Sequence, residues 1–318
     1  MIPIDLITGF LGAGKTTFLL RYVRYLTGRG LRVGVLVYDH GAVNVDLPLL
    51  RPLRSERCEI ETVVGSLDPD CHRRRFRTKL IAMAMAGYDR IVVEPSGVFD
   101  MDEFFDTLSD APLDKWYEPG SVIAIVDAKL DDDTTPEEDY FLASQAASAG
   151  CVLLSHCQLA TEAEIAGTLR HLRSASEAIH AKLPPPDRIL AKDWDKLTDG
   201  DYRMLQSCGF GAAEFEKRIA GRESAFQSLP FLDLPLDGKA LREKAAALFR
   251  DPRCGRILRV KGFYREGEGW YQLNATAHET RTEPVPESKA ALLVIGCELN
   301  EDEINLLLTG RKPEHHIL

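Results

Sequence analysis

The first two thirds of the chain alternate short apolar runs with longer amphipathic segments. The runs are nearly continuous in apolar residues and rich in valine and isoleucine, which is typical of strands buried on both faces. They span residues 2–8, 31–38, 89–95, 121–128, 151–155 and 187–191. The segments between them, such as TTFLLRYVRYL, carry apolar residues at helical spacing. This alternation predicts an α/β fold built on a doubly wound, mostly parallel sheet.

The pattern changes near residue 222. The stretch SLPFLDLPLDG has two prolines and no clear period, so we interpret it as a linker, followed by a helix over KALREKAAALFR. Next, RILRVKGFYREGEGWYQLNAT alternates on both sides of a glycine-rich turn, which predicts a β-hairpin. AALLVIG is another strand, and Asn300 with Glu303 forms a helix start. The expected parts are residues 1–222, a linker and helix over 223–252, and a small α+β domain over 253–318.

Composition narrows the classes of partner. The chain is 45% hydrophobic and 28% charged, with a net charge of −10, which disfavours nucleic acid and anionic membranes because both select basic surfaces. No apolar run approaches the roughly 20 residues of a membrane span, and the start MIPIDLITGF lacks the features of a signal peptide. Seven scattered cysteines do not suggest a disulfide scaffold. We therefore expect a cytoplasmic protein.

A phosphate-binding motif lies between the first predicted strand and the first helix. GFLGAGKT, residues 9–16, fits G-x-x-x-x-G-K-[ST] in the strand–loop–helix context that this motif requires. Glycines let the backbone approach the phosphates, the lysine bridges the β- and γ-phosphates, and the threonine hydroxyl binds Mg²⁺. The expected phosphate-binding residues are Gly12, Ala13, Gly14, Lys15, Thr16 and Thr17.

Two further segments are expected at the same site. DRIVVEPSG places Glu94 at the carboxyl end of a buried strand, the edge where ligands of open α/β sheets bind. Glu94 can hold a magnesium-bound water or orient the attacking one, and the N–H of Gly97 can sense the γ-phosphate. Asp39 and His40 follow another strand end, where Asp39 can join the Mg²⁺ shell or serve as a turn residue, and His40 as a structural residue.

The motifs GFLGAGKTT, YDHGAVNVD, EPSG and IVDA, in this order and spacing, resemble those of the CobW-type P-loop GTPases, relatives of UreG and HypB. The segments LRVKGFYREGEGWYQL and LLVIGCEL are also similar to the carboxyl-terminal domain of that family. The resemblance covers nearly the whole chain. It implies a P-loop NTPase sheet with a small carboxyl-terminal domain, slow Mg²⁺-dependent hydrolysis of GTP, and a conformational switch in the delivery of a metal or metal cofactor.

The resemblance also implies roles for particular residues and a class of partner. Lys15, Asp39 and Glu94 would be the catalytic set, with Thr16, Asp39 and Glu94 around Mg²⁺. Asp39 would belong to the first switch, and Glu94 and Gly97 to the second. The client would be a metallo- or corrinoid protein, and a homodimer is left open.

One departure from the family concerns the transition metal. The family carries Gly-Cys-x-Cys-Cys where this chain reads GSLDPDC, so Ser66 replaces the first thiol and Cys71 remains. A single thiol with His72 is not a closed site. We expect the family's metal site to be lost; a site rebuilt on Cys71, His72 and His40, with Asp39 or Cys58, stays open.

The other departure concerns the base. Family members end the fifth run, here residues 151–155, with Asn-Lys-x-Asp, whose carboxylate accepts hydrogen bonds from guanine. Ser155, His156 and Gln158 stand at these positions. Without the carboxylate, the preference for guanine should fall by one to two powers of ten, since bonds to a charged group contribute about 1.5–3 kcal/mol. Gln158 can still donate and accept, and His156 can stack on a purine. Ser155, His156 and Gln158 either form a base site of reduced selectivity or are a loop without a role in binding. GTP is the expected nucleotide, and ATP is the alternative.

Three functions are compatible with these motifs. The first is the nucleoside triphosphatase switch, and the second is a nucleotide-binding assembly partner without a metal site, for which a preference for ATP is left open. The missing cysteines and the altered base motif favour the second, whereas the intact phosphate motif and Glu94 favour the first. A small-molecule kinase is disfavoured by EPSG and the carboxyl-terminal hairpin.

Overall fold

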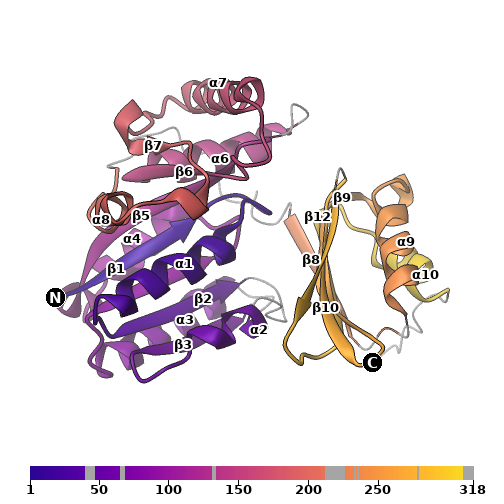
Figure 1. Ribbon diagram of the computed structural model, residues 1–318, viewed down its shortest axis with the longest axis horizontal. Helices are drawn as coiled ribbons and strands as arrows, with labels where there is room; N and C mark the ends of the chain where they lie inside the picture. The colour runs from indigo at the N-terminus through magenta and orange to yellow at the C-terminus, as the bar shows by residue number, and fades with distance from the viewer. Residues whose placement is uncertain are drawn as a thin grey trace. The chain divides into compact units, whose positions relative to one another are not determined.

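The structure is a computed structural model that describes residues 1–39, 47–64, 69–130, 134–211, 226–232, 234, 236–277 and 279–310 (Figure 1). The described residues form two compact units, which are considered separately. The first holds residues 1–39 and the described part of 52–211, and the second holds residues 47–51 and the described part of 226–310. None of the described helices is long and apolar enough to cross a membrane. The expected boundary near residue 222 lies outside the described residues.

The first unit contains, within the described residues, a seven-stranded sheet in the order β3-β2-β4-β1-β5-β6-β7. Each described pairing in this sheet is parallel. The strands are β1 (Ile2–Thr8), β2 (Val33–Asp39), β3 (Cys58–Val64), β4 (Arg90–Pro95), β5 (Tyr117–Asp127), β6 (Cys151–Ser155) and β7 (Ile189–Leu190). This confirms the predicted doubly wound α/β class. Because β1 lies at the centre, the loop after it has a neighbouring strand end on either side.

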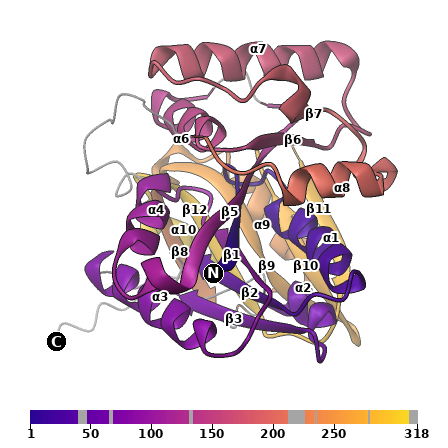
Figure 2. The same cartoon turned by 90° about the vertical axis from the view of Figure 1, so that its left-hand side faces the viewer.

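Helices cover both faces of this sheet. They are α1 (Lys15–Gly28), α3 (Pro69–Ala84), α4 (Met101–Ser109), α5 (Leu113–Trp116), α6 (Pro136–Ala147), α7 (Glu162–Ala178) and α8 (Asp199–Gln206). Figure 2 shows α1 and α8 on one side of the sheet and α3 and α4 on the other. The largest core cluster lies between strands and helices and includes the fully buried Leu36, Phe76 and Phe104.

The sequence pattern missed β3, and the reason is its place in the sheet. As an edge strand it is buried less than the central strands, and Glu59 and Glu61 interrupt its apolar residues. Both carboxylates are used: Glu61 pairs with Lys79 at 2.8 Å, and Glu59 accepts a bond of 2.5 Å from the hydroxyl of Tyr88. An alternating edge strand does not produce the continuous apolar run by which the central strands were found.

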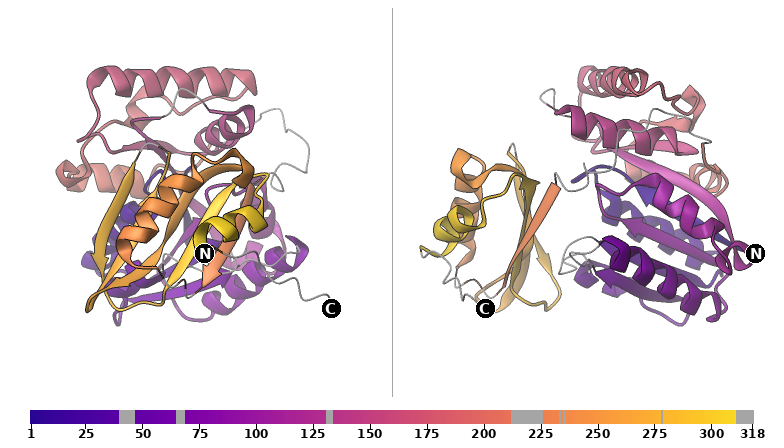
Figure 3. Two further views of the ribbon diagram at one scale, coloured as in Figure 1. Left: turned by 90° about the vertical axis from the view of Figure 1, so that its right-hand side faces the viewer. Right: turned by 180° about the vertical axis from the view of Figure 1, so that it is seen from behind.

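The second unit contains, in the part of the chain described, a five-stranded sheet in the order β11-β10-β9-β12-β8. The strands are β8 (Phe226–Leu232), β9 (Arg256–Glu266), β10 (Gly269–Ala275), β11 (Thr280–Val285) and β12 (Ala291–Cys297), and the helices are α2 (Leu47–Leu50), α9 (Gly238–Leu248) and α10 (Glu301–Thr309). Helices α9 and α10 lie on one face of this sheet (Figure 3). The predicted hairpin is confirmed as β9 and β10, and Asn300 caps α10 by accepting the N–H of Glu303 at 3.3 Å.

One interpretation of this half of the chain was wrong. Residues 226–232, expected as part of a linker, form β8 and pair antiparallel with β12. Pro230 lies opposite Leu293, which an edge strand tolerates because one side of the strand needs no partner for its N–H groups. The proline that suggested a linker is therefore an edge-strand proline.

A buried carboxylate connects the central strands to α1. Asp5 on β1 is fully buried and receives two contacts from Nη1 of Arg90 on β4, at 2.7 and 2.8 Å. It also accepts the hydroxyl of Tyr22 on α1 at 2.7 Å and the backbone N–H of Ser121 on β5 at 2.7 Å. Both oxygens are thus bonded, which offsets the cost of burying the charge. The network holds together three strands and the helix that begins at Lys15.

Replacing Arg90 by methionine should lower the free energy of unfolding by about 3–5 kcal/mol, because the Asp5 carboxylate is left buried without its counter-charge. Urea unfolding followed by circular dichroism measures the change. Arg203→Met is the matched control: Arg203 pairs with Asp199 at 3.0 Å on the surface, where the side chains are 63% and 52% exposed. That change should cost less than about 1 kcal/mol. Equal effects of the two substitutions would contradict the role given to Asp5.

Candidate functional site

The loop between β1 and α1 turns on glycines in left-handed conformations. Gly12 has a φ of 84° and Gly14 a φ of 94°, values that side chains with a Cβ atom rarely adopt. Gly14 is the residue directly before α1, so that the helix begins at Lys15. The amide groups of the first helical turn therefore face the end of the loop, and the helix dipole favours an anion there.

The Lys15 side chain folds back over the same loop. Its Nζ donates to the carbonyl oxygen of Gly9 at 2.8 Å and to that of Phe10 at 3.3 Å. Lys15 is only 9% exposed, and these carbonyl contacts offset the desolvation of its ammonium group. A positive charge is thereby held beside the loop's backbone amides, a combination that suits a polyphosphate.

Thr16 and Glu94 meet at the carboxyl edge of the sheet. The hydroxyl of Thr16, in the first turn of α1, donates to Oε1 of Glu94 at 2.5 Å, although the residues are 78 positions apart. Glu94 is 4% exposed and lies near the end of β4, which pairs directly with β1. Hydroxyl and carboxylate oxygens are the ligands that Mg²⁺ prefers, so this pair fits a magnesium ion.

Gly97 brings the loop after β4 against the phosphate loop. A Cβ atom built on Gly97 would lie 2.7 Å from the backbone nitrogen of Leu11 and 2.9 Å from its Cα. The backbone N–H of Ser96 donates to the carbonyl of Tyr38 at 2.8 Å, which attaches the same loop to β2. The two loops predicted to contact the terminal phosphates are thus in direct backbone contact.

Asp39 is the last residue of β2, and the strand register places it near this edge. Val37 pairs with Glu94 and Tyr38 with Pro95, so Asp39 follows one position beyond the paired end of β4. The described structure extends to the backbone of Asp39, while His40 lies outside the described residues. The predicted role of Asp39 in the Mg²⁺ shell stays a prediction.

In the turn after β6, the side chains of Ser155 and His156 form hydrogen bonds to residues of the neighbouring strand β5. Ser155 is 1% exposed, and its hydroxyl donates to the carbonyl of Val126 at 3.5 Å, so it faces the neighbouring strand. His156 has a φ of 54°, and its Nδ1 lies 2.9 Å from Oδ2 of Asp127 at the end of β5. Gln158 is exposed in the turn. The assignment of Ser155, His156 and Gln158 to base binding remains a prediction.

Two residues of this region carried no assigned role in the sequence analysis. Trp194 lies in the short 3₁₀ turn Trp194–Lys196 after β7, and its Cη2 atom is 3.3 Å from a Cβ built on Gly14. Its ring packs edge-on against that of Phe18, with 5.5 Å between the ring centroids. Its Nε1 donates to the carbonyl of Leu154 on β6 at 2.9 Å. Asp127 both orients His156 and accepts the N–H of Lys129 at 2.9 Å. The IVDA motif could have pointed to Asp127, but a lone tryptophan in a loop gives no signal.

The described residues contain no group of three or more His, Cys, Asp or Glu side chains that could hold a metal ion. His40 and Ser66, and the side chain of His72, lie outside the described residues, so the predicted alternatives for a rebuilt site stay open. Burial and the neighbouring Glu59 raise the pKa of Cys58 to about 11, which disfavours the thiolate that a soft metal needs. Cys71 is half-buried in the first turn of α3.

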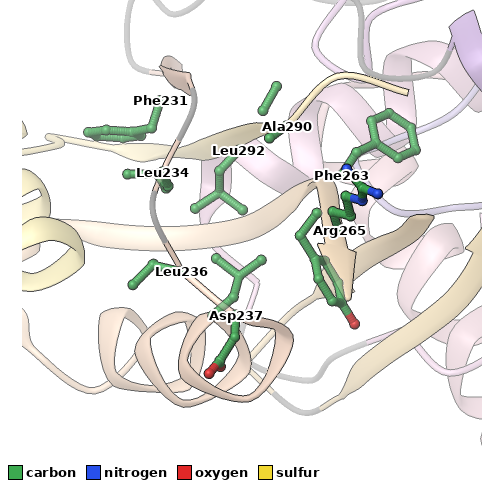
Figure 4. Close-up of a pocket in the computed structure, with 11 residues that line it drawn as sticks. Phe231, Leu234, Leu236, Asp237, Phe263, Arg265, Ala290 and Leu292 are labelled. Carbon is green, nitrogen blue, oxygen red and sulfur yellow. The ribbon is translucent and has the colours of Figure 1, made fainter. Parts of the chain in front are cut away.

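The second unit holds an apolar cavity of about 210 Å³ (Figure 4). Its walls come from the segment between β8 and α9 and from the ends of β9 and β12, and they include Phe231, Leu236, Phe263 and Leu292. Asp237 at its rim is the cap of α9, where its Oδ1 accepts the N–H of Ala240 at 2.7 Å. The polar groups of phosphate chemistry lie in the first unit, so this cavity is not the candidate site.

Comparison with known proteins gives one family for the first unit. The CobW/HypB/UreG nucleotide-binding domain matches residues 3–182. The chain is 28% identical over 325 residues to the zinc chaperone YjiA of Escherichia coli (strain K12), covering 97% of this chain and 98% of that one. It is 27% identical over 131 residues to the zinc chaperone YeiR of the same organism, covering 41% and 39%. The crystal structure of Zn(II)-bound YjiA GTPase aligns over 98% of this chain and 99% of that chain, with 21% identity and a TM-score of 0.41.

Gly97→Ala should destabilise the first unit by about 1–3 kcal/mol, because the new Cβ would overpack against the backbone of Leu11. Gly28→Ala is the matched control: a Cβ at Gly28, the last residue of α1, meets no described atom within 4 Å. That change should be neutral or stabilising by up to about 1 kcal/mol. Thermal unfolding of both variants measures the difference, and an unaffected Gly97→Ala protein would show that the two loops are not in contact.

Proposed function

The chain belongs to the CobW/HypB/UreG nucleotide-binding family, and on this premise we propose that it binds a nucleoside triphosphate with Mg²⁺ and hydrolyses it slowly, GTP being the first candidate. The observation that carries the proposal is the contact between Thr16 and Glu94. It joins the first helical turn after the phosphate loop to a buried carboxylate on the adjacent strand, at 2.5 Å. Such an arrangement serves a metal–phosphate complex better than it serves a neutral ligand.

Phosphoryl transfer needs positioning and neutralisation of charge more than covalent chemistry. Lys15 would neutralise charge on the β- and γ-phosphates, and the amides at the start of α1 would orient them. Thr16, Glu94 and Asp39 would hold Mg²⁺, which supplies further neutralisation when bound. Glu94 would also orient an attacking water, and the N–H of Gly97 would contact the γ-phosphate. With Ala13 and Thr17 completing the loop, this set suits slow turnover.

Base preference is the least constrained part of the proposal. His156, held by Asp127, follows β6, and the indole of Trp194 in the turn after β7 lies close to Gly14 of the phosphate loop. Both rings offer flat surfaces to a purine, and stacking of this kind distinguishes bases weakly. Guanine therefore remains the first candidate through family membership, by a narrow margin over adenine.

The chain connectivity supports a switch linked to the second unit. From Asp39, at the sheet edge beside Glu94, the chain leads into α2, which belongs to the second unit. A change at the γ-phosphate that moves the first switch would therefore act on a segment that the chain connects to α2. We propose that this coupling serves the delivery of a metal or metal cofactor to a client protein, as the names of the relatives suggest.

A second candidate is a nucleotide-dependent assembly partner that carries no metal. The observation favouring it is the chain's GSLDPDC in place of the family's cysteine cluster, together with the raised pKa of the buried Cys58. The nucleotide site would act in the same way in both candidates. The two differ in whether the protein binds and delivers a metal.

Lys15→Ala should weaken binding of Mg²⁺–GTP by roughly 10- to 100-fold, since a charge-assisted hydrogen bond contributes about 1.5–3 kcal/mol. Isothermal titration of GTP, GDP and ATP, followed by phosphate-release assays, measures binding and turnover. Lys239→Ala, at a lysine whose side chain is 80% exposed, is the control and should bind as the wild type does. Wild-type protein that binds no triphosphate at micromolar concentration would refute the switch; ATP bound more tightly than GTP would reverse the base assignment.

Titration with Zn²⁺, Co²⁺ and Ni²⁺ distinguishes the metal-delivery function from the assembly partner without a metal. If the chain delivers a metal, tight stoichiometric binding should be present and should be lost in Cys71→Ser, because the site expected on Cys71, His72 and His40 uses that thiol. Cys151→Ser is the control, since burial raises the pKa of Cys151 to about 12 and keeps it out of metal chemistry. Wild-type protein without tight binding would favour the assembly partner.

A further inference from the structure

A glutamine on α6 holds the loop that carries Gly97. Gln145 is 1% exposed, and its Nε2 donates to the carbonyl of Gly97 at 3.0 Å and to that of Phe99 at 3.5 Å. Its Oε1 is buried and has no hydrogen-bond partner in the part of the chain that the structure describes. An amide oxygen left in this state costs free energy. The two hydrogen bonds that Nε2 donates to the loop offset the cost of burying the oxygen.

Gln145 adds two hydrogen bonds to the other contacts that hold the loop after β4 in place. The N–H of Ser96 is bonded to β2, and the Phe99 ring packs edge-on against Tyr38 at 5.4 Å. Between these two points lies Gly97, whose backbone would otherwise rotate more freely than that of other residues. The bond from Gln145 fixes the Gly97 carbonyl from α6, while a Cβ atom at Gly97 would lie 2.7 Å from the backbone nitrogen of Leu11 in the phosphate loop.

We propose that Gln145 is a positioning residue for the γ-phosphate contact of Gly97. The inference rests on the proposed function and deepens it, since it assigns the discrimination between triphosphate and diphosphate to α6. With its carbonyl held, Gly97 keeps one backbone orientation before nucleotide arrives, so less conformational entropy is lost when the γ-phosphate binds. A diphosphate contacts the loop of residues 9–17 without reaching Gly97, and its affinity is independent of Gln145.

The test is the ratio of affinities for a non-hydrolysable GTP analogue and for GDP, both with Mg²⁺. Gln145→Met keeps the length of the side chain and removes the donor; it should weaken the triphosphate analogue about tenfold and change GDP less than twofold. Ser144→Ala is the matched control, because the Ser144 hydroxyl bonds within α6, to the carbonyl of Phe141 at 3.2 Å. It should leave the ratio unchanged. A role of Gln145 in stability alone would lower the melting temperature without changing the ratio.

A second variant keeps the test decisive if Gln145→Met does not fold. Gln145→Glu restores one O–H donor when the carboxyl group is protonated and repels the loop carbonyls when it is ionised, and burial raises the pKa of such a group. Its discrimination between triphosphate and diphosphate should match the wild type at low pH and fall as pH rises, with no such change in wild type or Ser144→Ala beyond the titration of the phosphates.

The outcomes are distinguishable. Wild-type protein that discriminates between the nucleotides, together with Gln145 variants that discriminate equally well at every pH, would overturn this inference and leave the proposed function standing. Wild-type protein that binds neither nucleotide would overturn both. Loss of discrimination confined to the Gln145 variants is the result we expect.

Discussion

Strand β1 is paired in parallel with β4 on one side and β5 on the other, and the candidate site depends on this arrangement. Parallel strands end at the same edge of a sheet, so the loop after β1 starts between the strand ends that carry Glu94 on β4 and Asp127 on β5. Asp5 secures the arrangement from within: one buried carboxylate accepts bonds from β4, β5 and α1. The same residue thereby fixes the strand before the phosphate loop and the helix after it, which is a strong constraint on where Lys15 and Thr16 can lie.

The loop after β4 is held as firmly as the phosphate loop it touches. Its contacts run to β2 through Ser96, to α6 through Gln145, and to the aromatic cluster of Tyr38 and Phe99. Tyr38 also donates its hydroxyl to Glu103 on α4, a carboxyl whose pKa burial raises. Because Tyr38 directly precedes Asp39, the two segments proposed as switches are both linked to these packing contacts. A displacement of either loop would therefore change the contacts of the other. A nucleotide switch requires such coupling.

The sequence was sufficient for the parts of the protein that depend on local chemistry. The phosphate loop needs particular glycines, Lys15 and Thr16 between a strand and a helix, and this pattern predicted the loop and its orientation. The central strands were found because burial on both faces requires continuous apolar residues. The edge strands β3 and β8 escaped for the same reason: β3 carries Glu59 and Glu61, and β8 contains Pro230. The contacts of Asp5, Gln145 and Trp194 join residues from distant parts of the chain, and their spacing holds no period or motif that could have revealed them.

Hydrogen–deuterium exchange tests most directly whether the two loops form one phosphate site. Amide exchange should be compared for the free protein, the Mg²⁺–GDP complex and the complex with a non-hydrolysable GTP analogue. The diphosphate should slow exchange in residues 9–17, and the triphosphate should slow it there and additionally in residues 96–99. Equal protection by both nucleotides in the two loops, or protection absent from residues 9–17, would contradict the account.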